Sequence, residues 1–96
     1  MVRVARGLIA RTRGLIGSDG SFALLIPRCN WIHTWFMSYP LDVYYLDRRG
    51  EVVKKVTVAP GRFTRPVRGA TAVLEVPAGL DGEVVLKACG GLWPEN

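Results

Sequence analysis

The fold class of this chain is decided by residues 43–58, VYYLDRRGEVVKKVTV. Two runs rich in β-branched and aromatic residues, Val43 to Leu46 and Glu51 to Val58, flank the tetrapeptide Asp47-Arg48-Arg49-Gly50. Such runs are typical of strands. Gly50 can adopt the positive φ that a hairpin loop often needs. The segment is therefore predicted to form a β-hairpin.

Short apolar runs separated by Gly, Pro and Asp continue on both sides of this hairpin, and they predict further strands. Pro60-Gly61 and Pro77-Ala78-Gly79 mark turns, and residues 62–69 lack a clear period and are predicted to form a loop. The additional strands are expected at Val2 to Ala5, Phe22 to Ile26, Thr34 to Met37, Thr71 to Val76 and Glu83 to Ala88.

One amphipathic helix is predicted near the N-terminus. Leu8, Ile9, Leu15 and Ile16 recur at helical spacing with arginines between them, and Gly17 is a natural C-terminal cap. We expect this helix to pack on the sheet rather than on a membrane surface. The predicted fold is mainly β with one N-terminal helix, a small barrel-like or jelly-roll-like sandwich, because closing or covering a sheet limits its exposed edges.

The composition fits one domain spanning residues 1–96, with 49% hydrophobic and 22% charged residues. Arginines interrupt every apolar window near the start, so we expect no signal peptide, and no apolar run is long enough to span a membrane. We expect a soluble, cytoplasmic protein. Cys29 and Cys89 are interpreted as reduced, partly buried thiols, with a single bridge between them left open.

The candidate site lies in residues 32–42, where the only histidine and an aspartate occur among large apolar side chains. Ionisable groups in such a setting must be hydrogen-bonded, neutralised or used, so they mark a functional-site candidate. The leading hypothesis is a non-enzymatic binding or accessory domain for an unknown small molecule or protein partner. Its cleft is predicted to contain His33, Thr34, Trp35, Met37, Asp42 and Glu75.

Structural roles and catalysis are the alternatives for these residues. His33 could tie a loop to a strand, Asp42 could cap a turn, and Glu75 could lie on a solvated face, opposite to Leu74 and Val76. A small hydrolase-like enzyme would use His33 as the general base and Asp42 as its orienting partner. No nucleophile is obvious in the sequence.

Metal and cofactor binding are not expected. Cys29 and His33 are four residues apart, which is only half of a paired zinc pattern. The spacing of the remaining acidic residues and Cys89 does not complete it.

A basic stretch raises the question of nucleic acid, because the chain has a formal net charge of +5. We expect a solvated basic face, since no RNA- or DNA-binding motif accompanies the stretch. A nucleic-acid-binding module remains an alternative, because phosphate contacts need only positive charge. Its residues would be Lys54, Lys55, Arg62, Arg65 and Arg68, which run without an acidic residue between them.

Several segments follow one another along most of the chain: Arg13 to Gly17, Ile32 to Thr34, Phe36-Met37, Pro40 to Val43, Leu46-Asp47, Gly50 to Val53, Pro60 and Leu74 to Gly79. Together, in this order, they resemble domain-of-unknown-function family 192. The resemblance implies a compact, mainly β fold like a small barrel or jelly-roll sandwich with a helix near the N-terminus, and it implies no particular activity. Many relatives look exported or lipid-anchored, and they often have Met in place of Ile16.

Overall fold

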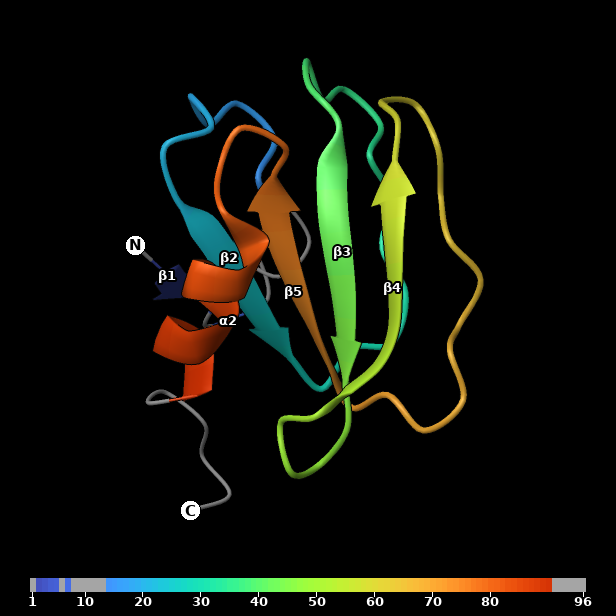
Figure 1. Cartoon of the computed structure of the whole chain (residues 1–96). Coiled ribbons are helices and arrows are strands. Elements are labelled where there is room, and N and C mark those ends of the chain that lie inside the picture. Colours follow the sequence, from blue (N-terminus) through green and yellow to red (C-terminus); the bar gives the residue numbers. More distant parts are fainter. Residues whose placement is uncertain (1, 6, 8–13, 91–96) are drawn as a thin grey trace.

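A five-stranded mixed sheet organises the chain in the computed structural model (Figure 1). The structure describes residues 2–5, 7 and 14–90. Its strands and helix are β1 (Val2–Val4), β2 (Ala23–Pro27), β3 (Leu41–Leu46), β4 (Val52–Val58), β5 (Ala72–Pro77) and α2 (Gly82–Gly90).

The sheet is open, with the strand order β1-β2-β5-β3-β4. β1 runs parallel to β2, and the other neighbouring pairs are antiparallel. The prediction of a mainly β fold is confirmed, but the prediction of a closed barrel or jelly-roll sandwich is wrong, because β1 and β4 remain edge strands. Covering each face of a sheet buries its apolar side chains without requiring closure.

The hairpin predicted from residues 43–58 is confirmed as β3 and β4. The Asp47 carboxylate accepts hydrogen bonds from the backbone N–H of Arg49 at 2.8 Å and of Glu51 at 3.0 Å. Gly50 adopts a φ of 83°. A register shift between Tyr45 and Leu46 marks a β-bulge where the hairpin enters its turn.

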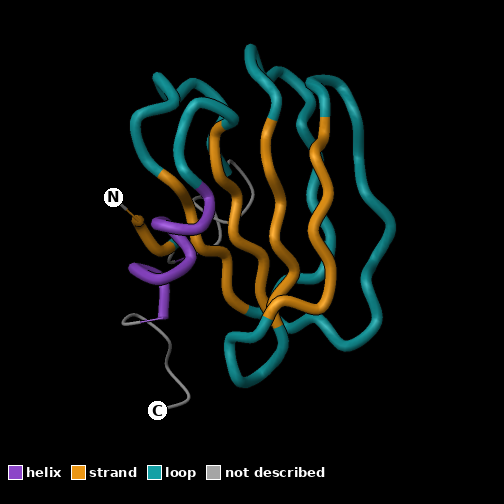
Figure 2. Tube along the Cα trace, in the orientation of Figure 1, coloured by secondary structure: helices purple, strands orange, loops and turns teal. Residues whose placement is uncertain are grey.

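The two faces of the sheet carry separate apolar cores, because side chains alternate along each strand. The helix face includes Tyr44, Leu46, Leu74 and Val76, and α2 packs on it. Figure 1 shows α2 in front of the sheet, and Figure 2 shows the long loops that connect the strands. Those loops cover the other face, here called the loop face, where the buried strand residues include Leu24, Ile26, Leu41, Val43, Tyr45, Val58 and Val73.

The strand predicted at Glu83 to Ala88 is wrong, because these residues belong to α2. Asp81 caps this helix, and its carboxylate accepts the backbone N–H groups of Glu83 at 3.0 Å and Val84 at 3.3 Å. Val85 and Cys89, four residues apart, bury one side of the helix against the sheet. A short apolar run fits either a strand or a helix. The Asp81 cap and the four-residue spacing of Val85 and Cys89 were the features that indicated a helix.

The helix described by the structure is therefore C-terminal, not N-terminal. The predicted N-terminal helix falls largely on residues 8–13, which lie outside the described residues. The end of that predicted segment, residues 14–17, forms a turn in which Leu15 is buried in the loop-face core. None of the helices in the described part of the chain is long and apolar enough to cross a membrane.

The strand predicted at Thr34 to Met37 is also wrong, because the chain turns there. The backbone N–H of Met37 donates to the carbonyl of Thr34 at 3.2 Å, and Phe36 has a φ of 68°. This positive φ is incompatible with an extended strand. The strands predicted around β1, β2 and β5 are confirmed, as are the turns at residues 60–61 and 77–79.

The two cysteines are not joined by a disulfide bond, and they contribute to different cores. Cys29 packs against the loop-face core, and its thiol donates to the backbone carbonyl of Trp31 at 2.9 Å. Cys89 lies in the helix-face core, and burial raises the pKa of its thiol. The sheet therefore separates the two sulfur atoms.

Candidate functional site

Two loop segments pair into a short ribbon, residues 30–35 with residues 61–67, which we call the aromatic ribbon. Its centre is an antiparallel bridge between His33 and Phe63. The Thr34 N–H donates to the Arg62 carbonyl at 2.7 Å, and the Thr64 N–H donates to the Ile32 carbonyl at 2.8 Å. Backbone pairing therefore fixes the positions of side chains that are 30 residues apart in the sequence.

Side chains on the first segment of the ribbon alternate between the core and solvent. Ile32 and Thr34 are buried, whereas Trp31 and Trp35 are exposed. This alternation is expected for an extended segment that packs one side on a core. It places Trp31, His33 and Trp35 on the outer side of the ribbon.

Three rings from the two segments form an aromatic face, defined by His33, Trp35 and Phe63. The His33 and Trp35 rings stack with centroids 4.9 Å apart and planes inclined by 27°. The Trp35 and Phe63 rings are tilted by 58° with centroids 6.4 Å apart. Trp35 remains 49% exposed and Phe63 62% exposed. The structure thus holds large rings together while leaving much of their surface in water.

His33 is anchored by its backbone and its ring contact. Its Nδ1 atom is buried and has no hydrogen-bond partner among the described residues. The ring is only partly exposed, since it lies against Trp35. His33 therefore contributes an apolar ring surface to the aromatic face, and its buried nitrogen is directed away from solvent.

Thr34 and Met37, two further residues of the predicted cleft, have the environment of scaffold residues. Thr34 is fully buried, and its hydroxyl donates to the Ala59 carbonyl at 2.6 Å and accepts from the Arg62 N–H at 2.9 Å. Met37 packs in the loop-face core. Both residues therefore support the ribbon from beneath.

Asp42 and Glu75 lie on opposite faces of the sheet. Asp42 pairs in register with Val76 and therefore belongs to the helix face, whereas Glu75 pairs with Val43 on the loop face. The Asp42 carboxylate accepts a hydrogen bond from the hydroxyl of Thr57 on β4 at 2.8 Å. The structure does not bring these two carboxyl groups together.

Glu75 is a buried acid in the middle of the sheet. Only 3% of the residue is exposed, and its Oε1 atom has no hydrogen-bond partner within the described residues. Burial raises the pKa of Glu75 to about 8, because the charged form is poorly solvated there. At neutral pH the carboxyl group is therefore mostly protonated. The alternative that Glu75 lies on a solvated face is therefore wrong.

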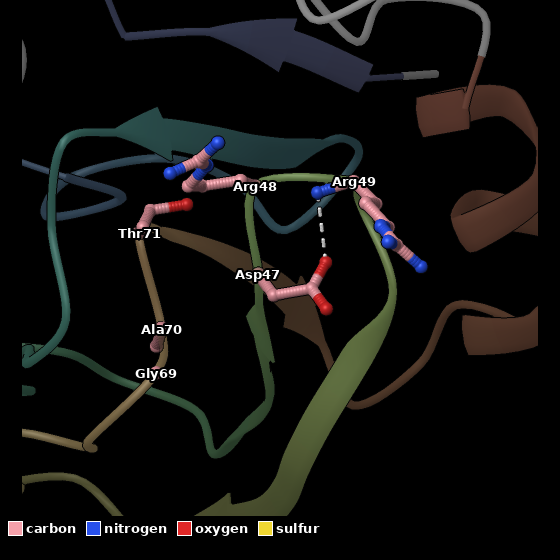
Figure 3. Close-up of a pocket in the computed structure, with 6 residues that line it drawn as sticks. All are labelled: Asp47, Arg48, Arg49, Gly69, Ala70 and Thr71. Carbon is pink, nitrogen blue, oxygen red and sulfur yellow. Dashed lines mark hydrogen bonds between the residues drawn. The ribbon is translucent and has the colours of Figure 1, made fainter.

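A shallow pocket of about 660 Å³ lies at the hairpin turn (Figure 3). Asp47, Arg48 and Arg49 line one side, and residues 69–71 line the other. Figure 3 shows the Arg48 and Arg49 side chains pointing in different directions. Their charges do not converge on one point, so the pocket lacks the convergent polar groups that typify a small-molecule site.

The basic residues of the predicted nucleic-acid stretch divide into two groups. Lys54 and Lys55 are exposed on β4, and the Lys55 ammonium group lies 5.4 Å from the centroid of the Tyr44 ring on the helix face. The remaining three are all exposed. Arg62 and Arg65 lie in the second segment of the aromatic ribbon, and Arg68 follows that segment.

Phe63 and Trp31 were not among the residues of the cleft predicted from the sequence. The alternation of aromatic and other residues from Trp31 to Trp35 was an available signal for Trp31. No local signal indicated Phe63, because its role depends on pairing with His33. Within residues 2–5, 7 and 14–90, no group of three His, Cys, Asp or Glu side chains could hold a metal ion.

Comparison with known proteins identifies the family. The model of DUF192, described as an uncharacterised ACR, matches residues 1–88. A UPF0127 protein of Pyrococcus horikoshii is 36% identical over 85 residues, covering 82% of this chain and 74% of that protein. A UPF0127 protein of Thermococcus sibiricus is 36% identical over 86 residues, covering 82% of this chain and 56% of that protein.

A solved structure shares the fold. The crystal structure of a protein of unknown function from Novosphingobium aromaticivorans aligns with a TM-score of 0.68 and 22% identity. The alignment covers 95% of this chain and 68% of that protein. The family model and the relatives from Pyrococcus and Thermococcus establish that the chain belongs to the DUF192 family, and those relatives are named UPF0127 proteins.

Proposed function

We propose that this domain is a binding module whose ligand stacks on the aromatic face of His33, Trp35 and Phe63. The observation that carries the proposal is the stack of His33 on Trp35, at 4.9 Å, on a tryptophan that is half exposed. Contiguous apolar patches on a protein surface mark sites of interaction with other molecules. A flat ligand would cover these rings and remove their surface from water.

The rings are pre-organised for binding. They lie on a ribbon fixed by backbone hydrogen bonds, and the buried Thr34 hydroxyl ties that ribbon to residues 59 and 62. A site whose side chains are already ordered loses little conformational entropy when a ligand binds. This rigidity supports a recognition role for the aromatic face.

The proposed contact surface is narrower than the cleft predicted from the sequence. His33 and Trp35 remain in it, and Phe63 joins them. Thr34 and Met37 act as its scaffold. Asp42 bonds Thr57 from the helix face, and Glu75 is buried in the sheet, so the proposal assigns neither carboxyl group to ligand contact.

The proposal is tested by NMR titration of the ¹⁵N-labelled protein with three separate probes. These are a dodecathymidylate oligonucleotide, chitohexaose and a proline-rich decapeptide, each titrated to millimolar concentration. We expect one probe to shift the Trp35 indole resonance and the amide resonances of residues 61–64. Assignment of the indole signal comes from its loss in the Trp35→Phe variant.

Two variants test whether the probe binds at the aromatic face. Trp35→Ala should weaken binding of the active probe by about 5-fold or more, because ring stacking is lost. Val84→Ala removes an exposed apolar side chain from α2 and should leave binding unchanged. Shifts confined to other surfaces, equal binding by Trp35→Ala, or no response to any probe would contradict the proposal.

A further inference from the structure

We infer that the ligand of the aromatic face is single-stranded nucleic acid, with bases stacked on the rings and phosphates held by Arg62, Arg65 and Arg68. This inference rests on the proposed function and names its ligand class. Proteins that bind single strands combine exposed aromatic rings with a positively charged path for the backbone. The aromatic ribbon provides both from residues that are distant in sequence.

The ribbon is free of negative charge along both of its segments. No Asp or Glu occurs between residues 20 and 41 or between residues 52 and 74. These ranges contain the whole of the aromatic ribbon and the loop that leads from it to β5. A polyanion that follows the ribbon therefore meets arginines without meeting a carboxylate of either segment, and the net charge of +5 favours its approach.

Arginines and rings also occur close together along the second segment of the ribbon. Arg62 directly precedes Phe63 in the sequence, and Arg65 follows Phe63 by two residues. Both arginines are exposed, as is Trp31. Guanidinium groups beside stacking rings can bind phosphates while the bases lie on the rings.

The rings favour a single strand over a duplex. A base stacks on a protein ring only when one of its own faces is free, and in a duplex the neighbouring base pairs occupy those faces. Phe63 and Trp35 expose about half or more of their surface, so they offer such a platform. Sequence preference is expected to be weak, because every base has a flat face.

The inference is tested by fluorescence anisotropy of the full chain with 5′-labelled dodecathymidylate and with a 12-base-pair duplex. We expect the single strand to bind more tightly than the duplex at 50 mM salt. Three phosphate contacts predict that affinity for the single strand falls by about 20-fold between 50 and 200 mM salt. A duplex that binds as tightly as the single strand would overturn the inference.

Variants separate the stacking and charge contributions. The triple variant Arg62→Gln, Arg65→Gln, Arg68→Gln should reduce the slope of log affinity against log salt by about 2. Trp35→Ala should weaken binding by about 5- to 100-fold and leave that slope unchanged, whereas Trp35→Phe should restore much of the affinity. Lys87→Gln removes one charge from exposed α2 and should change neither quantity.

The results distinguish this inference from the proposed function. Binding of chitohexaose or the peptide to the aromatic face, with no oligonucleotide binding at 50 mM salt, would overturn the nucleic-acid inference and retain the binding module. No binding by any probe would overturn both. Far-UV circular dichroism of each variant verifies that it is folded, and an unchanged salt slope in a folded triple arginine variant would also contradict the inference.

Discussion

Glu75 and Gly14 face one another on the loop face of the sheet, although 60 residues of sequence separate them. A Cβ atom added to Gly14 would lie 3.2 Å from the Glu75 Oε1 atom, and Gly14 has a φ of +58°. The turn that begins at Gly14 therefore approaches the carboxyl group closely. This approach helps to explain why Glu75 is buried and why its pKa is raised to about 8.

The buried carboxyl group predicts that the protein is less stable at alkaline pH. The pKa of Glu75 rises from 4.5 in the unfolded chain to about 8 in the folded protein, so the folded state holds the proton more tightly. The stabilisation that comes from the protonated Glu75 carboxyl group is fully present below pH 4.5, and it is lost as pH rises through 8. The loss is expected to be on the order of a few kcal/mol.

Urea denaturation at several pH values measures this effect. Glu75→Gln keeps the shape of the neutral side chain, so its free energy of unfolding should not show this decline between pH 5 and pH 9. Glu83→Gln removes an exposed carboxylate of α2 and should retain the decline of the unmodified protein. An equal decline in Glu75→Gln would show that another group is responsible.

Substitution of Gly82 tests the contact between α2 and β3. A Cβ atom at Gly82 would overlap the Tyr44 hydroxyl and lie 3.0 Å from the ring Cζ atom. Gly82→Ala should therefore lower the free energy of unfolding by about 1–3 kcal/mol, as overpacking does in a core. Thermal or urea denaturation measures the change.

A double-mutant cycle identifies the cause of that loss. Tyr44→Phe removes the hydroxyl, so the variant carrying both substitutions should lose less stability than the sum of the single variants. Gly90→Ala is the control, because a Cβ atom at Gly90 meets nothing within 4 Å. Strict additivity of Gly82→Ala and Tyr44→Phe would exclude a clash at the hydroxyl.

Removal of the Thr34 hydroxyl is expected to loosen the aromatic ribbon. Thr34→Val preserves the side-chain volume but leaves the Ala59 carbonyl and the Arg62 N–H without their partner. The expected cost is about 1–3 kcal/mol of unfolding free energy. Thr34→Ser retains the hydroxyl and should keep the slow amide exchange of the ribbon. Hydrogen exchange measures both effects, and equal exchange in Val and Ser variants would argue against the hydroxyl's role.

The helix cap at Asp81 gives a prediction independent of the ribbon. Asp81→Ala removes the acceptor for the N–H groups of Glu83 and Val84 and should cost about 1 kcal/mol. Asp81→Asn retains an acceptor oxygen and should be nearly as stable as the unmodified protein. Chemical denaturation compares the two variants. If the Asp81→Ala variant were as stable as the unmodified protein, α2 would not depend on this cap.

Local patterns in the sequence were sufficient to predict the hairpin and the strands β2 and β5. The Asp47 to Gly50 turn chemistry sits between two strand-like runs, so nearby residues alone specify it. Alternation also assigned Glu75 to the face opposite Leu74 and Val76, and the two cores confirm that separation. Alternation could not decide whether that face was solvated or buried.

The candidate site was only partly predictable for the same reason. His33 and Trp35 were chosen because unusual residues occurred together, but their exposure and their pairing with Phe63 depend on a segment 30 residues away. Asp42 is near His33 in the sequence, yet its carboxylate bonds Thr57 across the hairpin. Proximity along the chain did not indicate which side chains share a surface.

Residues within a few positions of one another were enough to specify the mainly β class, the central hairpin and the alternation of side chains. The open sheet, the covering helix at residues 82–90 and the meeting of three rings on one ribbon depend instead on contacts between distant segments. These features follow from which distant segments cover which face, and burial against those segments overrides the local preference of a short apolar run.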